Sequence, residues 1–297
     1  MEKDLVKVKK NAIKKTKGER IAFVIAFAVF AVYSLSIALS VIWLFYNSLK
    51  PNTLEWVNDK ISLPSAFTWS NYRLAFSAIN YRDVNFFGMF LNSIWFAGGM
   101  SALSVLMHAL TGYAFAKYRF LGKEAAFSFI VFTIMLPVVG TLPSFYRIVT
   151  KMSLTESPLF LVTALGGFGG NFLIMYAYFK GIDWSYAEAA FIDGAGHYLV
   201  LFKIMMRMAL TPMFALFLVG FIGQWNNYEQ PMLFLDTISP LSSGLYRFYL
   251  GMVRDTTGKG ELLYFAGVIM SMIPVLVLVS IFGGKIMKNI STGGLKG

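Results

Sequence analysis

Long apolar runs alternate with short polar breaks along the whole chain. A helix needs roughly 20 apolar residues to cross the hydrocarbon core of a bilayer. By this measure the sequence predicts an all-α, polytopic membrane protein with six transmembrane helices, at about 21–46, 86–116, 125–146, 158–179, 209–235 and 262–287. Pro137 and Pro143 interrupt the backbone hydrogen bonds of the third helix, which we therefore expect to end early or to bend. Six crossings place both termini on one side of the membrane.

A polar, glycine-containing segment at 185–196 separates the fourth and fifth apolar runs. Ser185 and Glu188 have the spacing of a capping box, which predicts a short helix beginning near Tyr186. Gly194 and Gly196 favour the end of that helix, and a second helix should follow. This pattern predicts an exposed docking surface, not a catalytic pair. The alternative is an ordinary amphipathic helix that lies on the membrane surface.

Composition agrees with a membrane protein and removes several other classes. Charged residues make up 14% of the chain and apolar residues 57%, whereas soluble domains are roughly 25% charged. The chain has no cysteine and only two histidines, His108 and His197. These counts exclude disulfides, thiolate metal sites and a histidine metal cluster. The spans also lack a nucleophile with a base and paired carboxylates, so we predict no catalytic residue and no metal site.

The uneven distribution of basic residues predicts the orientation. Eight of the 26 lysines and arginines fall in residues 1–20. In the six-helix layout, 17 basic residues lie on the side of the termini and of the loop at 180–208, and nine lie opposite. Because cytoplasmic segments carry excess Lys and Arg, we predict that both termini and this loop are cytoplasmic. The net charge of +11 then reflects topology and attraction to anionic lipid, and no nucleic-acid partner is expected.

The sequence has no recognisable nucleotide-hydrolysing motif. No lysine has the upstream glycine spacing and the following Ser or Thr of a phosphate-binding P-loop. If this membrane protein performs work that needs energy, the energy must therefore come from another subunit or from an ion gradient.

The segment at 185–196 resembles the cytoplasmic coupling loop of permease subunits in bacterial ABC importers that work with a substrate-binding protein. The matching residues, in family order and spacing, are Glu188, Ala189, Ala190, Gly194 and Ile204. Those permeases usually carry Leu-Pro just after the isoleucine. This chain has Met206 and Arg207 there, and its nearest proline is Pro212. The departure leaves the end of the second loop helix open.

Other segments resemble sugar-importer permeases in the same order along the chain. They are 48–50, 63–72, 112–122, Trp225-Asn226 with Tyr228 and Pro231, and 291–297. The last resembles the C-terminal tail of the shorter permease of a maltose-type pair, which in the family lies against the ATPase subunits. The resemblance runs from about 48 to 297 and implies a type I ABC importer permease architecture.

The resemblance also implies an assembly and a site. The expected partners are a second, homologous permease, two cytoplasmic ATPase subunits that bind ATP and Mg, and an extracytoplasmic sugar-binding protein in a bacterial cytoplasmic membrane. This chain would hold no cofactor itself. The residues expected to contact the ATPase are Glu188, Ala189, Ala190, Asp193 and Gly194. The simplest division is a basic segment at 1–20, a six-helix permease domain at 21–287 and a cytoplasmic tail at 288–297.

A dense polar group late in the fifth span is a candidate substrate pathway. Its residues are Gln224, Trp225, Asn226, Asn227, Tyr228 and Glu229. Amides and carboxylates pair with sugar hydroxyls, and aromatic rings stack on apolar sugar faces. The alternative is that these residues join helices to one another or line a water-filled exit.

Three other kinds of transporter stay open at this point. An ABC permease could carry another solute, such as a polyol or a glycerol phosphate, although an anionic substrate would want a cation in mid-span and none is found there. A secondary transporter or a channel could use Glu229 as its ion-coupling carboxylate. Many secondary transporters show internal symmetry, and the sequence shows none.

Overall fold

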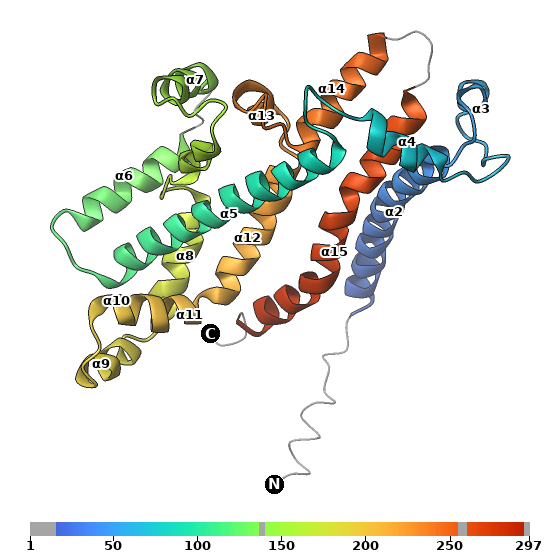
Figure 1. Cartoon of the computed structure of the whole chain (residues 1–297). Coiled ribbons are helices and arrows are strands. Elements are labelled where there is room, and N and C mark those ends of the chain that lie inside the picture. The colour runs from blue at the N-terminus through green and yellow to red at the C-terminus, as the bar shows by residue number, and fades with distance from the viewer. Residues whose placement is uncertain (1–15, 137–139, 255–259, 294–297) are drawn as a thin grey trace.

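The computed structural model describes residues 16–136, 140–254 and 260–293, and every regular element in these ranges is helical (Figure 1). The elements are α2 Lys17–Ser48, α3 Thr53–Asn58, α4 Ser70–Ala78, α5 Phe86–Lys117, α6 Lys123–Met135, α7 Leu142–Lys151, the 3-10 helix η1 Pro158–Ala164, α8 Gly170–Gly181, α9 Ser185–Ile192, α10 His197–Leu199, the π-helix η2 Val200–Met205, α11 Met206–Met208, α12 Leu210–Trp225, α13 Glu229–Phe234, α14 Leu241–Arg254 and α15 Glu261–Gly293. The predicted all-α class is confirmed. Most of the basic segment at 1–20 and the end of the tail at 288–297 lie outside the described residues.

Three described helices, α2, α5 and α15, are long and apolar enough to cross a membrane. A fourth span exists if α10, η2 and α11 are counted with α12, to which they are joined by a bend of 69°. The predicted third span is divided into α6 and α7, and the predicted fourth into η1 and α8. With 13 residues, α6 is about 20 Å long, whereas the hydrocarbon core is about 30 Å thick. The count of six crossings therefore stays a prediction.

The centre of the fold is α5, which packs against α8 and α12 (Figure 1). Gly112 lies where α5 meets α8. A Cβ atom built on Gly112 would come 2.9 Å from both the Cβ of Met175 and the backbone N of Tyr176. Thr111 adds a hydrogen bond from its hydroxyl to the carbonyl of Gly167, at 2.6 Å. A small residue on α5 thus lets the two backbones approach closely, as in other membrane helix pairs.

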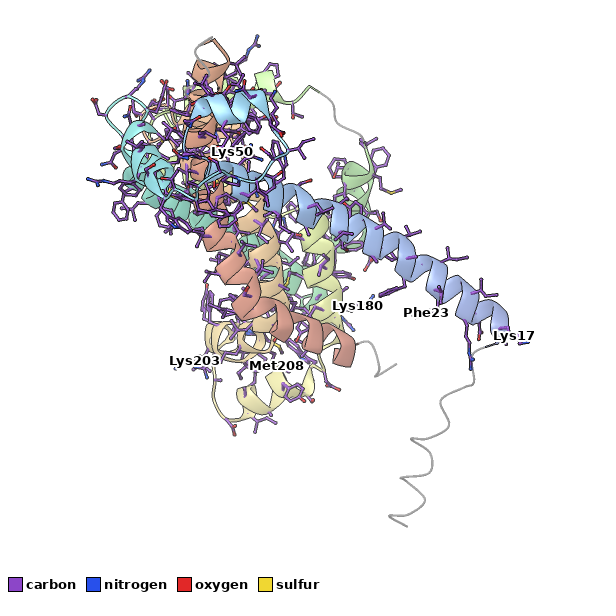
Figure 2. All side chains as sticks on the ribbon, turned by 90° about the vertical axis from the view of Figure 1, so that its right-hand side faces the viewer. Lys17, Phe23, Lys50, Lys180, Lys203 and Met208 are labelled. Atoms are coloured by element: carbon purple, nitrogen blue, oxygen red, sulfur yellow. The ribbon has the colours of Figure 1, made fainter. Side chains whose placement is uncertain are left out.

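The first long helix, α2, projects from the rest of the fold. Figure 2 shows its first half, with Lys17 and Phe23, extending away from the other helices. None of its most apolar window is buried within the described chain. Its last turns are anchored, because Trp43 contacts Trp56 and Phe265 at ring-centroid distances of 5.4 and 5.8 Å. Since α2 is apolar all round, it presents a face to lipid or to another helix.

The loops at the end of the molecule with α3, α4, α7, α13 and α14 are held by a charged group that we name the Asp236 clamp. The Asp236 carboxylate forms ion pairs with Arg82 and Arg247 and accepts a hydrogen bond from the hydroxyl of Tyr81 at 2.8 Å. The carboxylate of Glu156 accepts from the backbone N–H of Asp236, also at 2.8 Å. Three loops that are far apart in sequence are thereby joined.

Candidate coupling loop and substrate cleft

The predicted short helix is α9, which begins at Ser185, one residue before the expected start. The predicted capping box is wrong, since Trp184 is the N-cap and its side chain makes no capping bond. The N–H of Ser185 donates instead to Oδ1 of Asp183, at 2.8 Å. This bond is the main cause of the lowered pKa of the Asp183 carboxyl. Asp183, which the sequence analysis did not single out, thus fixes the start of the helix.

The end of α9 is a Schellman motif centred on Gly194. The N–H of Ala195 donates to the carbonyl of Ala190 at 2.9 Å, and the N–H of Gly194 donates to the carbonyl of Phe191 at 3.0 Å. Gly194 has φ of +84°, in the left-handed region that favours glycine. A Cβ atom there would meet nothing within 4 Å. The requirement for glycine is therefore conformational, not steric.

The predicted ATPase-contacting residues lie together on α9 and the turn that follows. Glu188, Ala189, Asp193 and Gly194 are exposed, and Ala190 is partly buried. Two large apolar side chains extend this surface, because Ile192 is 86% exposed and Tyr198 is 81% exposed. We call the exposed surface formed by Glu188, Ala189, Ile192, Asp193, Gly194 and Tyr198 the α9 knob. The sequence analysis did not identify Ile192 and Tyr198. The signal that could have identified them is their position, because one apolar residue precedes the glycine turn and the other follows it.

The inner face of α9 joins a buried cluster built from α5, α8 and the second loop helix, and α9 packs mainly against η2 of that loop helix. Ala187 is fully buried in this cluster, which also contains Tyr113 and Phe179, whose ring centroids are 5.5 Å apart. The rings of His197 and Phe191 are 4.9 Å apart, which ties the second loop helix to the first. The small alanine side allows close packing of α9, so the knob is supported by the second loop helix and, through the shared cluster, by α5 and α8.

The second loop helix runs from His197 to Met208 and meets α12 at the 69° bend. It contains the π-helix η2, a local distortion that is frequent at functional sites. Pro212 lies in the first turn of α12, where a proline is tolerated. Its missing N–H would otherwise face the carbonyl of Met208, which instead accepts a hydrogen bond from the Tyr178 hydroxyl at 2.7 Å. The sequence analysis left the end of the second loop helix open, because this chain departs from the family sequence at Met206 and Arg207. In the structure that helix ends at Met208.

A cleft of about 220 Å³ opens toward the other end of α12. Its walls come from the end of α12, from α14 and from α15, and none of its lining residues carries a charge. The lining residues are Trp225, Asn226, Tyr228, Ser242, Leu245, Tyr246, Tyr264, Val268 and Ser271. The rings of Tyr228 and Tyr246 stack at 4.3 Å. The cleft thus offers aromatic faces, hydroxyls and one amide, which is the chemistry that binds polyhydroxylated solutes.

Only part of the predicted polar group faces this cleft. Trp225, Asn226 and Tyr228 line it, and the indole N–H of Trp225 also donates to the carbonyl of Ser271 at 3.1 Å. The amide of Asn227 donates to Gln224 at 3.1 Å, so these two side chains join one another. Glu229 is exposed in the first turn of α13. Sequence reasoning missed the lining residues on α14 and α15.

Fold and site together define a class of protein. Apolar membrane helices carry an exposed helical knob at one end and an uncharged polar and aromatic cleft toward the other. In the described ranges no group of three or more His, Cys, Asp or Glu residues could hold a metal ion. The arrangement is that of a helical membrane transport subunit.

Comparison with known proteins gives the family. Residues 108–290 match the family described as the binding-protein-dependent transport system inner membrane component, and the chain belongs to this family. It is therefore a non-enzymatic permease subunit of an ABC transporter and an inner membrane component. The predicted family is confirmed.

Two curated relatives and one solved structure match almost the whole chain. The diacetylchitobiose uptake system permease protein NgcG of Streptomyces coelicolor is 26% identical over 274 residues, covering 91% of this chain and 87% of that protein. The arabinooligosaccharides transport system permease protein AraQ of Halalkalibacterium halodurans is 26% identical over 283 residues, covering 93% and 94%. A chain of a bacterial ABC transporter involved in the import of the acidic polysaccharide alginate superposes with a TM-score of 0.73 at 21% identity, covering 91% of this chain and 98% of that one. This likeness shows a shared fold.

Proposed function

We propose that this permease forms part of the translocation pathway of an ATP-driven importer for a sugar or oligosaccharide, and that its α9 knob couples the pathway to cytoplasmic ATPase subunits. The observation that carries the coupling role is the construction of the knob. Its outer face is exposed, whereas Ala187 on its inner face is completely buried in a cluster that joins residues of α5, α8 and the second loop helix. A force applied to the knob therefore acts on the central helices and is not absorbed by a flexible loop.

The substrate class is supported by the cleft and by the relatives. Both curated relatives are named for the uptake or transport of saccharides. Tyr228 and Tyr246 give the cleft a stacked aromatic face, while Asn226 and Ser242 supply polar groups beside it. Because the lining has no cation, the cleft favours a neutral saccharide over a glycerol phosphate. A neutral polyol is the second solute that this chemistry fits.

The partners follow from the same proposal. The exposed apolar face of α2 suits a second, homologous permease, which would cover the apolar window that the described chain leaves unburied. The knob suits a groove on one of two ATPase subunits, which bind ATP and Mg, and an extracytoplasmic sugar-binding protein delivers substrate at the opposite end. The membrane is the bacterial cytoplasmic membrane, with both termini and the knob on the cytoplasmic side. The chain itself binds no cofactor and no nucleic acid.

The coupling role is tested with two glycines that differ only in backbone conformation. Neither Gly194 nor Gly196 has an atom within 4 Å of a built Cβ, but only Gly194 has positive φ. Gly194→Ala should destabilise the turn by about 1 kcal/mol, because alanine disfavours a positive φ, and should displace the knob. Gly196→Ala is the matched control, because its φ is one that alanine adopts without strain. Both variants are purified with the co-expressed permease and ATPase subunits and reconstituted in proteoliposomes.

We expect Gly194→Ala to lower ATPase recovery or substrate-stimulated ATP hydrolysis, while Gly196→Ala behaves as wild type. The proposal fails if no ATPase purifies with the wild type, or if the two variants are indistinguishable. Uptake of labelled oligosaccharides by the same proteoliposomes tests the substrate class, and Tyr228→Phe should reduce uptake without changing ATPase recovery.

A further inference from the structure

A second cavity, distinct from the substrate cleft, lies beside the coupling loop. It has a volume of about 470 Å³ and is lined by Ala116, Lys117, Arg119, Lys123 and Trp184. Its walls come from the last turn of α5, the first residue of α6 and the residue that precedes α9. We call it the cationic pocket. It lies at the end of a membrane-spanning helix and on the same side as the α9 knob (Figure 1).

Three cations line this pocket, and in the described part of the chain none of them forms an ion pair. The ammonium of Lys117 donates to the carbonyl of Ile182 and lies 5.9 Å from the ring centroid of Trp184. The ammonium of Lys123 donates to the carbonyl of Tyr118 at 3.0 Å. Each lysine has three donors, so donors remain for a ligand, and the exposed guanidinium of Arg119 adds a planar fork.

Carboxylates near the pocket offset only part of the charge of its three cations. Asp183 attracts Lys117 electrostatically, but its Oδ1 accepts the N–H of Ser185 and it is not among the lining residues. Glu124 is exposed and also lies outside the lining. The cavity therefore has a net positive lining that favours an anion with several acceptor oxygens.

Apolar side chains beside the cations indicate where that anion comes from. Leu121 is 104% exposed and Phe120 is 45% exposed, and both lie between Arg119 and Lys123 in sequence. Trp184 forms one wall, and tryptophan is typical of the level of lipid headgroups. Cations that flank exposed apolar residues at the end of a span match a phospholipid, whose phosphate is charged and whose chains are apolar.

We propose that the cationic pocket binds the phosphate of an anionic phospholipid headgroup. Arg119 and Lys123 contact the phosphate, and Lys117 links the occupied pocket to Ile182, three residues before α9 begins. A bound lipid thereby braces the connection between α5 and the α9 knob. Binding itself depends only on this chain and does not rest on the proposed saccharide transport.

The test measures lipid retention by the full-length chain. The protein is purified in mixed micelles of a nonionic detergent with equal amounts of phosphatidylglycerol and phosphatidylcholine, and retained lipid is counted by native mass spectrometry. The double variant Arg119→Gln with Lys123→Gln removes two pocket cations. The matched control is Lys180→Gln with Lys203→Gln, which removes two cations from the same end of the molecule outside the pocket (Figure 2).

We expect the pocket variant to bind one phosphatidylglycerol about 30-fold more weakly, which corresponds to about 2 kcal/mol at 1.4 kcal/mol per tenfold for two cations. Phosphatidylcholine retention and the control variant should be unchanged. The exposed single variant Arg119→Gln should weaken binding about 5-fold, and it keeps the test valid if the double variant misfolds. The charge-preserving pair Arg119→Lys with Lys123→Arg should retain the lipid.

Several results would overturn the proposal. One is equal retention of phosphatidylglycerol by the pocket variant and wild type, and another is equal loss in the control. Displacement of the lipid by inorganic phosphate would assign the pocket to a soluble phosphate. If the pocket variant keeps the lipid but loses copurifying ATPase, the cations belong to a protein interface.

Discussion

At the 69° bend between the coupling loop and α12, one backbone carbonyl takes a hydrogen bond from a side chain of another helix. Pro212 has no N–H, so the carbonyl of Met208, four residues earlier, lacks its usual helical donor. The hydroxyl of Tyr178 on α8 donates to this carbonyl at 2.7 Å. Tyr178→Phe removes the donor and little else. We expect the variant to lose stability and to loosen the connection between the loop helix and α12.

The magnitude follows from the kind of bond and its surroundings. A neutral hydrogen bond contributes about 1 kcal/mol in proteins, and bonds between membrane helices average about 0.6 kcal/mol. Tyr178 is 38% exposed, so part of the loss is recovered by other contacts of the carbonyl. The expected cost of Tyr178→Phe is therefore about 0.6–1 kcal/mol.

A double-mutant cycle identifies the cause. In Pro212→Ala the new N–H is free to donate to Met208, so Tyr178→Phe should cost almost nothing in that background. The expected coupling free energy is about 0.5–1 kcal/mol, measured by denaturant titration of all four proteins in mixed micelles. An equal cost of Tyr178→Phe in both backgrounds would refute the explanation, because the tyrosine would then act through packing alone.

Three further predictions concern other parts of the fold. Gly112→Ala should destabilise the α5–α8 contact, because its Cβ would lie 2.9 Å from the α8 backbone, whereas Gly98→Ala, with nothing within 4 Å, should be neutral or stabilising by about 0.5 kcal/mol in the same titration. Asp236→Asn should lower the free energy of unfolding by about 2 kcal/mol, which is less than the ~3–5 kcal/mol expected for a fully buried pair because the Asp236 side chain is 22% exposed. Its control, Asp83→Asn at an exposed position, should leave the free energy of unfolding unchanged. Backbone N–H groups of the two residues Ile61 and Ser62 hold the pKa of the Asp59 carboxyl below its ordinary 3.8. The stability that these hydrogen bonds add is fully present at a pH above the ordinary pKa and is lost as the pH falls through the lowered pKa. Proteolysis of the segment at 52–68 should therefore rise only below a pH of about 4, and Asp59→Asn should abolish this pH dependence.

The helix–turn–helix of the coupling loop was predictable because its determinants are local. Alanines favour α9, and Gly194 supplies the left-handed residue at its end. The capping box failed for an equally local reason. In a capping box the N–H of Ser185 would donate to the carboxylate of Glu188, but it donates to Asp183, two residues earlier. The spacing of Ser185 and Glu188 does not reveal this competing acceptor.

The third and fourth spans show the limit of hydropathy. A window average counts apolar residues, but it does not register where the backbone ladder is interrupted. Pro143 lies in the first turn of α7, and the segment 165–169 separates η1 from α8, so each apolar run gives two short helices. The cleft shows a different limit. Trp225 and Tyr228 were identifiable as polar or amphipathic residues within a span, whereas Tyr264 reaches them only through the packing of α15 on α12.

The knob and the cleft are connected through α12, and this connection constrains how the permease can move. The knob packs on η2 and shares a buried cluster with α5 and α8, both of which contact α12, so we expect a displacement of α9 to act on these helices together. The opposite walls of the cleft belong to α14 and α15. Across that boundary the indole of Trp225 bonds to the carbonyl of Ser271 at 3.1 Å, and the rings of Tyr228 and Tyr246 stack. A movement that begins at the knob must therefore either carry α15 with α12 or separate these contacts. Because the contacts line the cleft, their separation changes its width. Under the proposed function, we expect this boundary to be the place where a movement of the coupling loop alters the space available to a substrate.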